Sequence, residues 1–249
     1  MAFGVCLVAM GIQQLSYGNI SPNFIPEAWA QAFLYKLAAY PWGIAFTLTG
    51  VAYLIPKKGY EVSLVSAAVF LLCFLLGYVP YMLISAPNKS ILYWAPAMEA
   101  LAFTGASLVI ARSFQPATPP SSPLLQSLSR LIPYGGAFFS IMLIVFGIDH
   151  YLIPAFVAQM VPSWIPFPVF WTYLTGAALI GAGIAITLRI KVRIVATLLG
   201  IMIFAWFLIL HIPRAIANPT VLGGLEVTRV FVTFGFTGIA FLMAMEKRD

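Results

Sequence analysis

Eight runs of predominantly apolar residues, each about as long as a bilayer is thick, follow one another along the 249-residue chain. A helix needs about 20 residues to cross the hydrocarbon core, and in lipid each segment must satisfy its own backbone hydrogen bonds. The runs are continuous and lack the alternating ten-residue strands of a membrane barrel. We therefore predict an all-α, polytopic membrane protein with eight transmembrane helices. The predicted spans are 1–17, 36–55, 62–84, 92–112, 131–150, 168–188, 192–212 and 225–245.

The composition excludes the soluble classes of protein. Hydrophobic residues make up 62% and charged residues 8%, whereas an ordinary soluble domain carries about 25% charged residues. A soluble fold of this size cannot hide so much apolar surface. The lipid bilayer is therefore the expected partner, and a nucleic-acid binder is excluded despite the net charge of +6. Cys6 and Cys73 form no C-x-x-C motif. No nucleophile elbow, P-loop, zinc-protease or dinucleotide motif is present, so the sequence leaves open whether the protein is an enzyme.

A Pro- and Ser-rich linker divides the predicted helices into two groups of four. It covers residues 113–129, where four prolines and five serines oppose a continuous helix. Short motifs recur in the same order on both sides, which indicates an internal duplication. The pairs include Gly11-Ile12 with Gly147-Ile148, Leu48-Thr49-Gly50 with Leu174-Thr175-Gly176, Val79-Pro80 with Ile212-Pro213, and Phe103-Thr104-Gly105 with Phe236-Thr237-Gly238. We predict two fused four-helix bundles, the first over residues 1–112 and the second over residues 130–249.

Lysine and arginine are distributed unequally between the two sides of the predicted membrane. The side of the termini holds Lys57, Lys58, Arg112, Arg130, Arg189, Lys191, Arg193, Lys247 and Arg248. The other side holds Lys36, Lys89, Arg214 and Arg229. The positive-inside rule then places both termini in the cytoplasm, as in a multi-pass protein of the cell inner (plasma) membrane. The first run is shorter than its counterpart, so we expect residues to be missing before Met1, and no basic segment that would mark a cleaved signal peptide precedes this run.

The stretch 130–219 resembles the DoxX-like superfamily of small four-helix membrane proteins. The resemblance is carried by Arg130 at the start of a helix, Gly147-Ile148-Asp149-His150, Val161-Pro162-Ser163-Trp164-Ile165-Pro166, Leu174-Thr175-Gly176 and His211-Ile212-Pro213-Arg214. It covers roughly this stretch well and the first half loosely. It implies a four-helix bundle per unit. It also implies a link to quinone-dependent sulfur oxidation or oxidative-stress responses, which is the role of some members, although many have no assigned activity.

Six ionisable residues gather at the outer ends of the second-half spans. They are Asp149, His150, His211, Arg214, Glu226 and Arg229. In the first half, the positions that correspond to Asp149, His150, His211 and Arg214 are Gln13, Gln14, Tyr78 and Tyr81, which carry no charge. Because ionisable groups in a membrane are costly, such a group predicts a functional site. One interpretation is a pocket for the headgroup of a quinone or another amphiphile, in which arginine binds oxygen and histidine transfers a proton. The other is a set of structural ion pairs: Asp149 with Arg214 or Arg229, and Glu226 with Arg229.

Three further possibilities concern the same polar residues. His150 and His211 could hold a b-type haem, although both lie at span ends beside charges, which disfavours haem. A metal site is disfavoured because neighbours in a helix point about 100° apart, so Asp149 and His150 cannot easily face one ion. Glu99 is the deepest acid and is either a relay for protons or substrate or a structural acid facing Tyr78 or Tyr81.

The functional prediction is therefore a membrane protein that binds a quinone or similar amphiphile in support of a membrane redox partner. One alternative is a non-catalytic structural subunit that packs in a larger membrane complex. The other is a carrier for a small hydrophobic solute.

Overall fold

The computed structural model describes residues 1–18, 26, 33–55, 59–85, 94–116, 118, 120 and 122–246. Within these residues the chain is all-helical and has no strand. Several charged residues used to predict the orientation lie outside the described residues, namely Lys57, Lys58, Lys89, Lys247 and Arg248.

Each half of the chain has four long helices within the described residues. Those of the first half are α1 (Ala2–Tyr17), α3 (Phe33–Leu54), α4 (Gly59–Leu72) and α5 (Ala95–Ser113). Those of the second half are α7 (Gly135–Leu152), α9 (Pro168–Thr187), α10 (Val192–Trp206) and α12 (Leu225–Met245). Six of these helices have bounds within a few residues of an apolar run, whereas the runs 62–84 and 192–212 are each divided between a long helix, α4 or α10, and the π-helical segments that follow it.

Shorter helical segments extend or connect the long helices. Two π-helical segments, η2 (Cys73–Tyr78) and η3 (Tyr81–Ser85), follow α4. The π-helical η6 (Phe207–His211) and α11 (Ile212–Ala217) follow α10. The remaining segments are α6 (Pro123–Ser129), η5 (Ile132–Tyr134), α8 (Pro154–Ala158) and η7 (Val221–Gly223). Helix α6 lies within the predicted linker over 113–129, and it begins at Pro123, in the first turn, where a proline is tolerated.

Among the residues that the structure describes, six helical segments are long and apolar enough to cross a membrane, which indicates a multi-pass membrane protein. They are Leu37–Leu54, Gly59–Ile84, Pro123–Leu152, Pro168–Thr187, Val192–Ala217 and Leu225–Met245. The other two expected spans fall short for different reasons. Helix α1 has only 16 residues. Helix α5 has 19 residues but contains Glu99 and Arg112, which lower its mean hydropathy.

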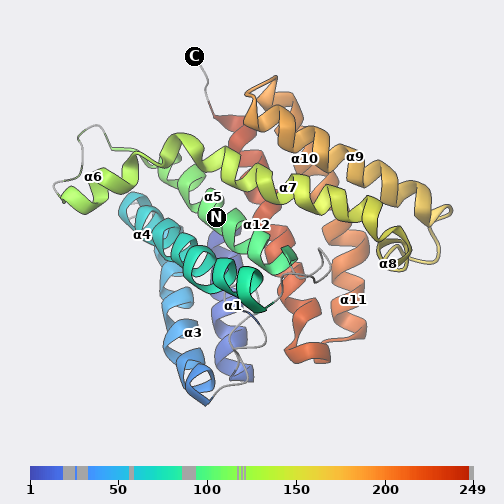
Figure 1. Cartoon of the computed structure of the whole chain (residues 1–249), viewed down its shortest axis with the longest axis horizontal. Coiled ribbons are helices and arrows are strands. Elements are labelled where there is room, and N and C mark those ends of the chain that lie inside the picture. The colour runs from blue at the N-terminus through green and yellow to red at the C-terminus, as the bar shows by residue number, and fades with distance from the viewer. Residues whose placement is uncertain are drawn as a thin grey trace.

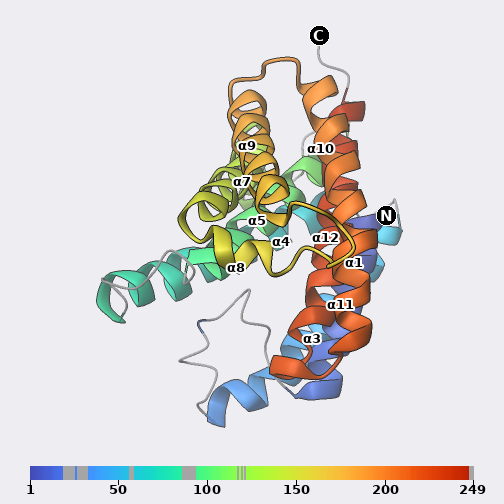
Figure 2. The ribbon, with the colours of Figure 1, turned by 90° about the vertical axis from the view of Figure 1, so that its right-hand side faces the viewer.

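The eight long helices form two layers that cross each other (Figures 1 and 2). One layer has the order α3, α1, α12, α10, and the other has the order α4, α5, α7, α9. The layers meet where α3 contacts α4, where α9 contacts α10, and in the middle, where α5 contacts α12. The first long helix of each half thus packs on the second long helix of its own half and also on the fourth long helix of the other half. This arrangement differs from two self-contained four-helix bundles, because each layer combines two helices from each half.

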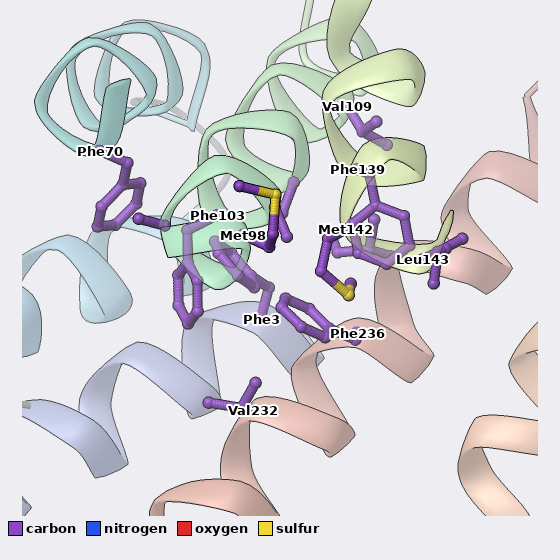
Figure 3. Packing of buried hydrophobic residues seen from close by; sticks show 14 of the residues in the cluster. Phe3, Phe70, Met98, Phe103, Val109, Phe139, Met142, Leu143, Val232 and Phe236 are labelled. Carbon is purple, nitrogen blue, oxygen red and sulfur yellow. The ribbon is translucent and has the colours of Figure 1, made fainter. Parts of the chain in front are cut away.

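Aromatic side chains join the two layers at their centre (Figure 3). The ring of Phe103 on α5 lies 5.3 Å from Phe3 on α1, 5.4 Å from Phe70 on α4 and 5.6 Å from Phe236 on α12, measured between ring centroids. Phe236 lies 5.2 Å from Phe139 on α7. Such tilted and edge-to-face pairs are favourable ring geometries. The contacts fill the space between the first-half helices and continue to α12, which forms one wall of a cavity in the second half.

Candidate ligand-binding site

A cavity of about 320 Å³ lies between α5, α7, α9, α10 and α12. The segments η6 and α11, which follow α10, also line it. Its lining includes all seven polar residues that the sequence analysis selected, namely Glu99, Asp149, His150, His211, Arg214, Glu226 and Arg229. They come from four separate helical regions: the first turns of α5 and α12, the last turn of α7, and the segments η6 and α11. The structure therefore brings the selected residues together, with Glu99 contributed by the first half of the chain.

A π-helical turn precedes the proline that separates His211 from Arg214. Proline has no N–H, and its ring clashes with the carbonyl four residues earlier in a regular α-helix. Segment η6 ends at His211, directly before Ile212-Pro213. The first half has the same feature, because η2 ends at Tyr78, two residues before Pro80. Such π-helical turns occur frequently at functional sites, and the last residue of this one, His211, lines the cavity.

Glu226 binds the side chains of two arginines at the cavity. The Nε and Nη2 atoms of Arg214 donate to Oε2 and Oε1 of Glu226 at 3.1 and 2.9 Å. Nη1 of Arg229 donates to Oε1 at 2.8 Å. The Glu226 side chain is 9% exposed, whereas the arginine side chains are 33% and 34% exposed. The bidentate contact orients the guanidinium of Arg214 rigidly, and it ties α11 to the start of α12.

Asp149 takes no part in this cluster. It is 7% exposed, and its Oδ1 atom has no hydrogen-bond partner among the described residues. The ion pair expected between Asp149 and Arg214 or Arg229 is absent from this part of the chain, because Glu226 holds both guanidinium groups. Of the ion pairs expected from the sequence, the described residues form the pair of Glu226 with Arg229. They also form the pair of Glu226 with Arg214, which the sequence analysis did not expect.

His150 is held by its own helix and by the close approach of α9. Its Nδ1 atom lies 2.6 Å from the carbonyl oxygen of Phe146. A carbonyl only accepts, so Nδ1 carries the proton and Nε2 keeps its lone pair. A Cβ on Gly176 would lie 2.8 Å from Cβ of His150, and one on Gly147 would lie 2.8 Å from the carbonyl oxygen of Gly176. The two glycines therefore permit the contact of α7 with α9 that places His150.

Two further residues selected from the sequence, His211 and Glu99, reach the cavity from η6 and α5. Nδ1 of His211 is buried without a partner among the described residues. Glu99 reaches the cavity from α5, four residues after the start of that helix. The expected contact of Glu99 with Tyr78 is not formed as a hydrogen bond, since the buried hydroxyl of Tyr78 also has no partner in the described part of the chain.

The rest of the cavity wall is mainly apolar, and sequence reasoning did not select it. Met142, Phe146, Leu179, Met202 and Phe236 line the part formed by the long helices. Another part is covered by the segment around α8, through Phe156, Val157, Met160 and Val161. The only signal in the sequence was the apolar character of the loop after α7. Apolar side chains are too common in this chain to mark a site.

No group of three or more His, Cys, Asp or Glu side chains that could hold a metal ion occurs in the described part of the chain. The polar groups at the cavity are instead hydrogen-bond donors and acceptors around an apolar space. This arrangement suits an organic ligand with one polar end and one apolar end.

A family described as a domain of unknown function (DUF8561) matches residues 139–233. The matched segment begins in α7 and ends in α12, and it contains every selected residue except Glu99. Neither the curated proteins nor the solved structures that were compared with the chain contain a match. The chain is thus similar to this family over the segment that forms most of the cavity.

Proposed function

We propose that the protein is a DoxX-like integral membrane protein that binds a quinone or another amphiphile in its second-half cavity, in support of a membrane redox system. The observation that carries the proposal is the shared cavity. All seven ionisable residues selected from the sequence line it together with a largely apolar wall. Scattered side chains facing lipid would have favoured a purely structural role.

The size and polarity of the cavity support this ligand class. Its volume of about 320 Å³ lies at the lower end of the range for ligand pockets, about 300–1,000 Å³. Arg214 and Arg229 retain N–H groups beyond those bound to Glu226, and guanidinium binds oxygen atoms well. His150 and His211 supply imidazoles, whose ring nitrogens can donate or accept hydrogen bonds. Together these groups suit the oxygen-bearing ring of a quinone, while the apolar wall suits its tail.

The same proposal includes the finer topology. We propose that all eight long helices cross the inner membrane with both termini in the cytoplasm, and that residues 1–112 and 130–249 are duplicated units. The matching π-helical segments before Pro80 and Pro213 support the duplication. The interleaved packing of α1 and α5 with membrane-spanning helices supports their insertion.

Ligand binding by the purified full-length chain tests the proposal. We expect quinone to be found among the extracted lipids, and a quinone with a short alkyl tail to bind the chain. His211→Ala should weaken this binding at least about tenfold, the effect of losing a hydrogen bond in a closed site. Arg193→Ala is a control, because Arg193 is an exposed side chain on α10 that does not line the cavity.

Three results would contradict the proposal. The first is that the intact chain neither retains nor binds quinone. The second is that His211→Ala changes only co-purification with other membrane proteins, as a structural subunit of a larger complex predicts. The third is uptake of a hydrophobic solute into liposomes that contain only this chain, as a carrier predicts. A thermal unfolding midpoint close to that of the unmodified chain ensures that the His211 variant is folded.

A further inference from the structure

A second cavity lies at the other end of the helices that form the first one. It has a volume of about 260 Å³ and is lined by residues of α5, η5, α7, α9 and α12 and of the turn after α9. Arg112 lies in the last turn of α5, Gly136 in the first turn of α7 and Met243 in the last turn of α12. Figure 2 shows the turn between α9 and α10 at the same end of the molecule as the C-terminal end of α12. No residue that lines this cavity also lines the first one.

The charged groups in the lining of the second cavity are two guanidinium groups and one carboxyl group, from Arg112, Arg189 and Glu246. Nη1 of Arg112 lies 3.6 Å from Oε2 of Glu246, which is an ion pair too long for a hydrogen bond. The side chain of Arg189 is exposed and forms no hydrogen bond or ion pair within the described part of the chain. The lining therefore carries a net positive charge, and N–H groups of both arginines remain available to an anion.

Arg189 occupies a backbone position at which glycine is the usual residue. At the end of α9, the N–H of Ile190 donates to the carbonyl oxygen of Ala185 at 2.8 Å. The N–H of Arg189 donates to the carbonyl oxygen of Ile186 at 3.1 Å. These two bonds form a Schellman motif, in which the residue at the position of Arg189 is left-handed, and its φ angle is 59°. A side chain there has a conformational cost that glycine avoids. The end of α9 therefore does not require arginine, whereas the cavity that it lines gives this side chain a role.

We propose that the second cavity binds the phosphate headgroup of an anionic phospholipid. Guanidinium groups bind phosphate oxygens through paired N–H donors, and basic pockets between membrane helices bind anionic lipid headgroups. Thr187 and Tyr134 add hydroxyl groups to the lining, while Ile186 and Met243 add apolar surface for the start of an acyl chain. The cavity lies at the C-terminal ends of α9 and α12, two helices long and apolar enough to cross a membrane, and therefore at the depth of lipid headgroups. The inference goes beyond the proposed function, because it concerns another cavity and another ligand.

Isothermal titration of the full-length chain in neutral detergent tests the inference. The probes are short-chain phosphatidylglycerol, phosphatidylcholine with the same acyl chains, and inorganic phosphate. We expect phosphatidylglycerol to bind at least about fivefold more tightly than phosphatidylcholine, because the choline cation is repelled by the two arginines. Arg189→Gly and Arg112→Gln should each weaken the binding of phosphatidylglycerol about fivefold, the effect of losing a hydrogen bond to a charged group at a partly exposed site. Glu246→Gln should strengthen it, because a negative charge is removed from the lining.

Lys191→Gly is a matched control for Arg189→Gly. Lys191 is exposed, has a positive φ angle of 43° and lies in the same turn, but it does not line the cavity. Both variants remove one positive charge and one left-handed side chain. We therefore expect both to unfold at the same temperature as the unmodified chain or at a higher one, while only Arg189→Gly weakens lipid binding.

The outcomes are distinguishable from one another and from those for the quinone site. Preferential binding of phosphatidylglycerol that falls in Arg189→Gly and Arg112→Gln, and persists in Lys191→Gly, supports the inference. An equal loss in Lys191→Gly overturns it, because attraction to the charged surface as a whole then accounts for the binding. Equal affinity for the two lipids overturns it as well, and inorganic phosphate that binds as tightly as phosphatidylglycerol shows a site for a free anion instead. A lower unfolding temperature of Arg189→Gly overturns the assignment of this side chain to binding. None of these results alters the test of quinone binding, because the two cavities share no lining residue.

Discussion

At the scale of single residues, Glu226 is the side chain on which the polar end of the cavity depends most. It accepts hydrogen bonds from Arg214 and Arg229, whose donor nitrogen atoms lie 2.8 to 3.1 Å from its carboxylate oxygen atoms. Removing one partner of a buried ion pair is costly because it leaves the other charge uncompensated. Here the arginines are a third exposed, so water reduces that cost.

We predict that Glu226→Gln lowers the free energy of unfolding by about 1–2 kcal/mol, less than the cost for a fully buried pair. The glutamine keeps the shape but loses the charge that holds both guanidinium groups. Thermal unfolding in detergent measures the change. Glu61→Gln should change the midpoint little, since Glu61 is exposed. Equal stability of the Glu226 variant and the unmodified chain would show that the ion pairs of Glu226 with Arg214 and Arg229 do not stabilise the fold.

At the scale of helices, the close contact of α7 with α9 decides where His150 lies. Gly147 and Gly176 allow this approach, which small residues commonly provide between membrane helices. Gly181 lies on the same helix as Gly176, yet a Cβ there would meet no atom within 4 Å. The two positions on α9 therefore differ sharply in what a methyl group would do.

Gly176→Ala should destabilise the protein by about 1–3 kcal/mol, the usual cost of overpacking, and it should weaken ligand binding. The added methyl group would lie 2.8 Å from Cβ of His150, so the two helices must separate. The matched variant Gly181→Ala should leave both properties unchanged or slightly raise stability, because alanine favours helix more than glycine does. Thermal unfolding and titration with the short-tailed ligand measure the two effects. The same result for both variants would argue against a tight α7–α9 contact.

At the scale of the whole molecule, the two halves hold each other through their first and fourth long helices. Helix α1 packs on α12, and α7 packs on α5. The cavity also needs both halves, because α5 supplies Glu99 while the second half supplies the other six residues. The covalent connection between the halves is therefore less important than the packing between them.

Cleavage of the connection should leave the halves associated. A protease site inserted between residues 116 and 122, before α6, lets the folded protein be cut in detergent. We expect the two fragments to co-purify and to keep ligand binding, because the apolar contacts of α1 with α12 and of α5 with α7 remain. Size-exclusion chromatography followed by gel electrophoresis reads out the association. Separation into two independent fragments would favour self-contained bundles instead.

Several features were predictable from residues that lie near one another in the chain. The eight apolar runs predicted the long helices, because a continuous apolar segment of this length can satisfy its backbone only as a helix. The motifs around Pro80 and Pro213 indicated equivalent positions, and both are now seen to follow π-helical segments. The polar residues of the cavity were selected because charge is rare and costly in such a chain. The apolar part of the wall, including Met142 and Val157, could not be selected, since it has the same composition as every helix.

The sequence by itself therefore determined the helical class, the approximate helix bounds, the membrane character and the identity of the ionisable residues, because these depend on local hydrophobicity and backbone hydrogen bonding. Only the tertiary structure decided that α1 packs across to α12, that Glu226 rather than Asp149 holds the arginines, and that Glu99 joins a cavity in the other half. These features depend on which apolar faces fit together. Apolar faces of similar composition do not by themselves specify which helix they pack against. Small differences in side-chain shape, such as the glycines of α7 and α9, select among arrangements that hydrophobicity alone leaves equivalent.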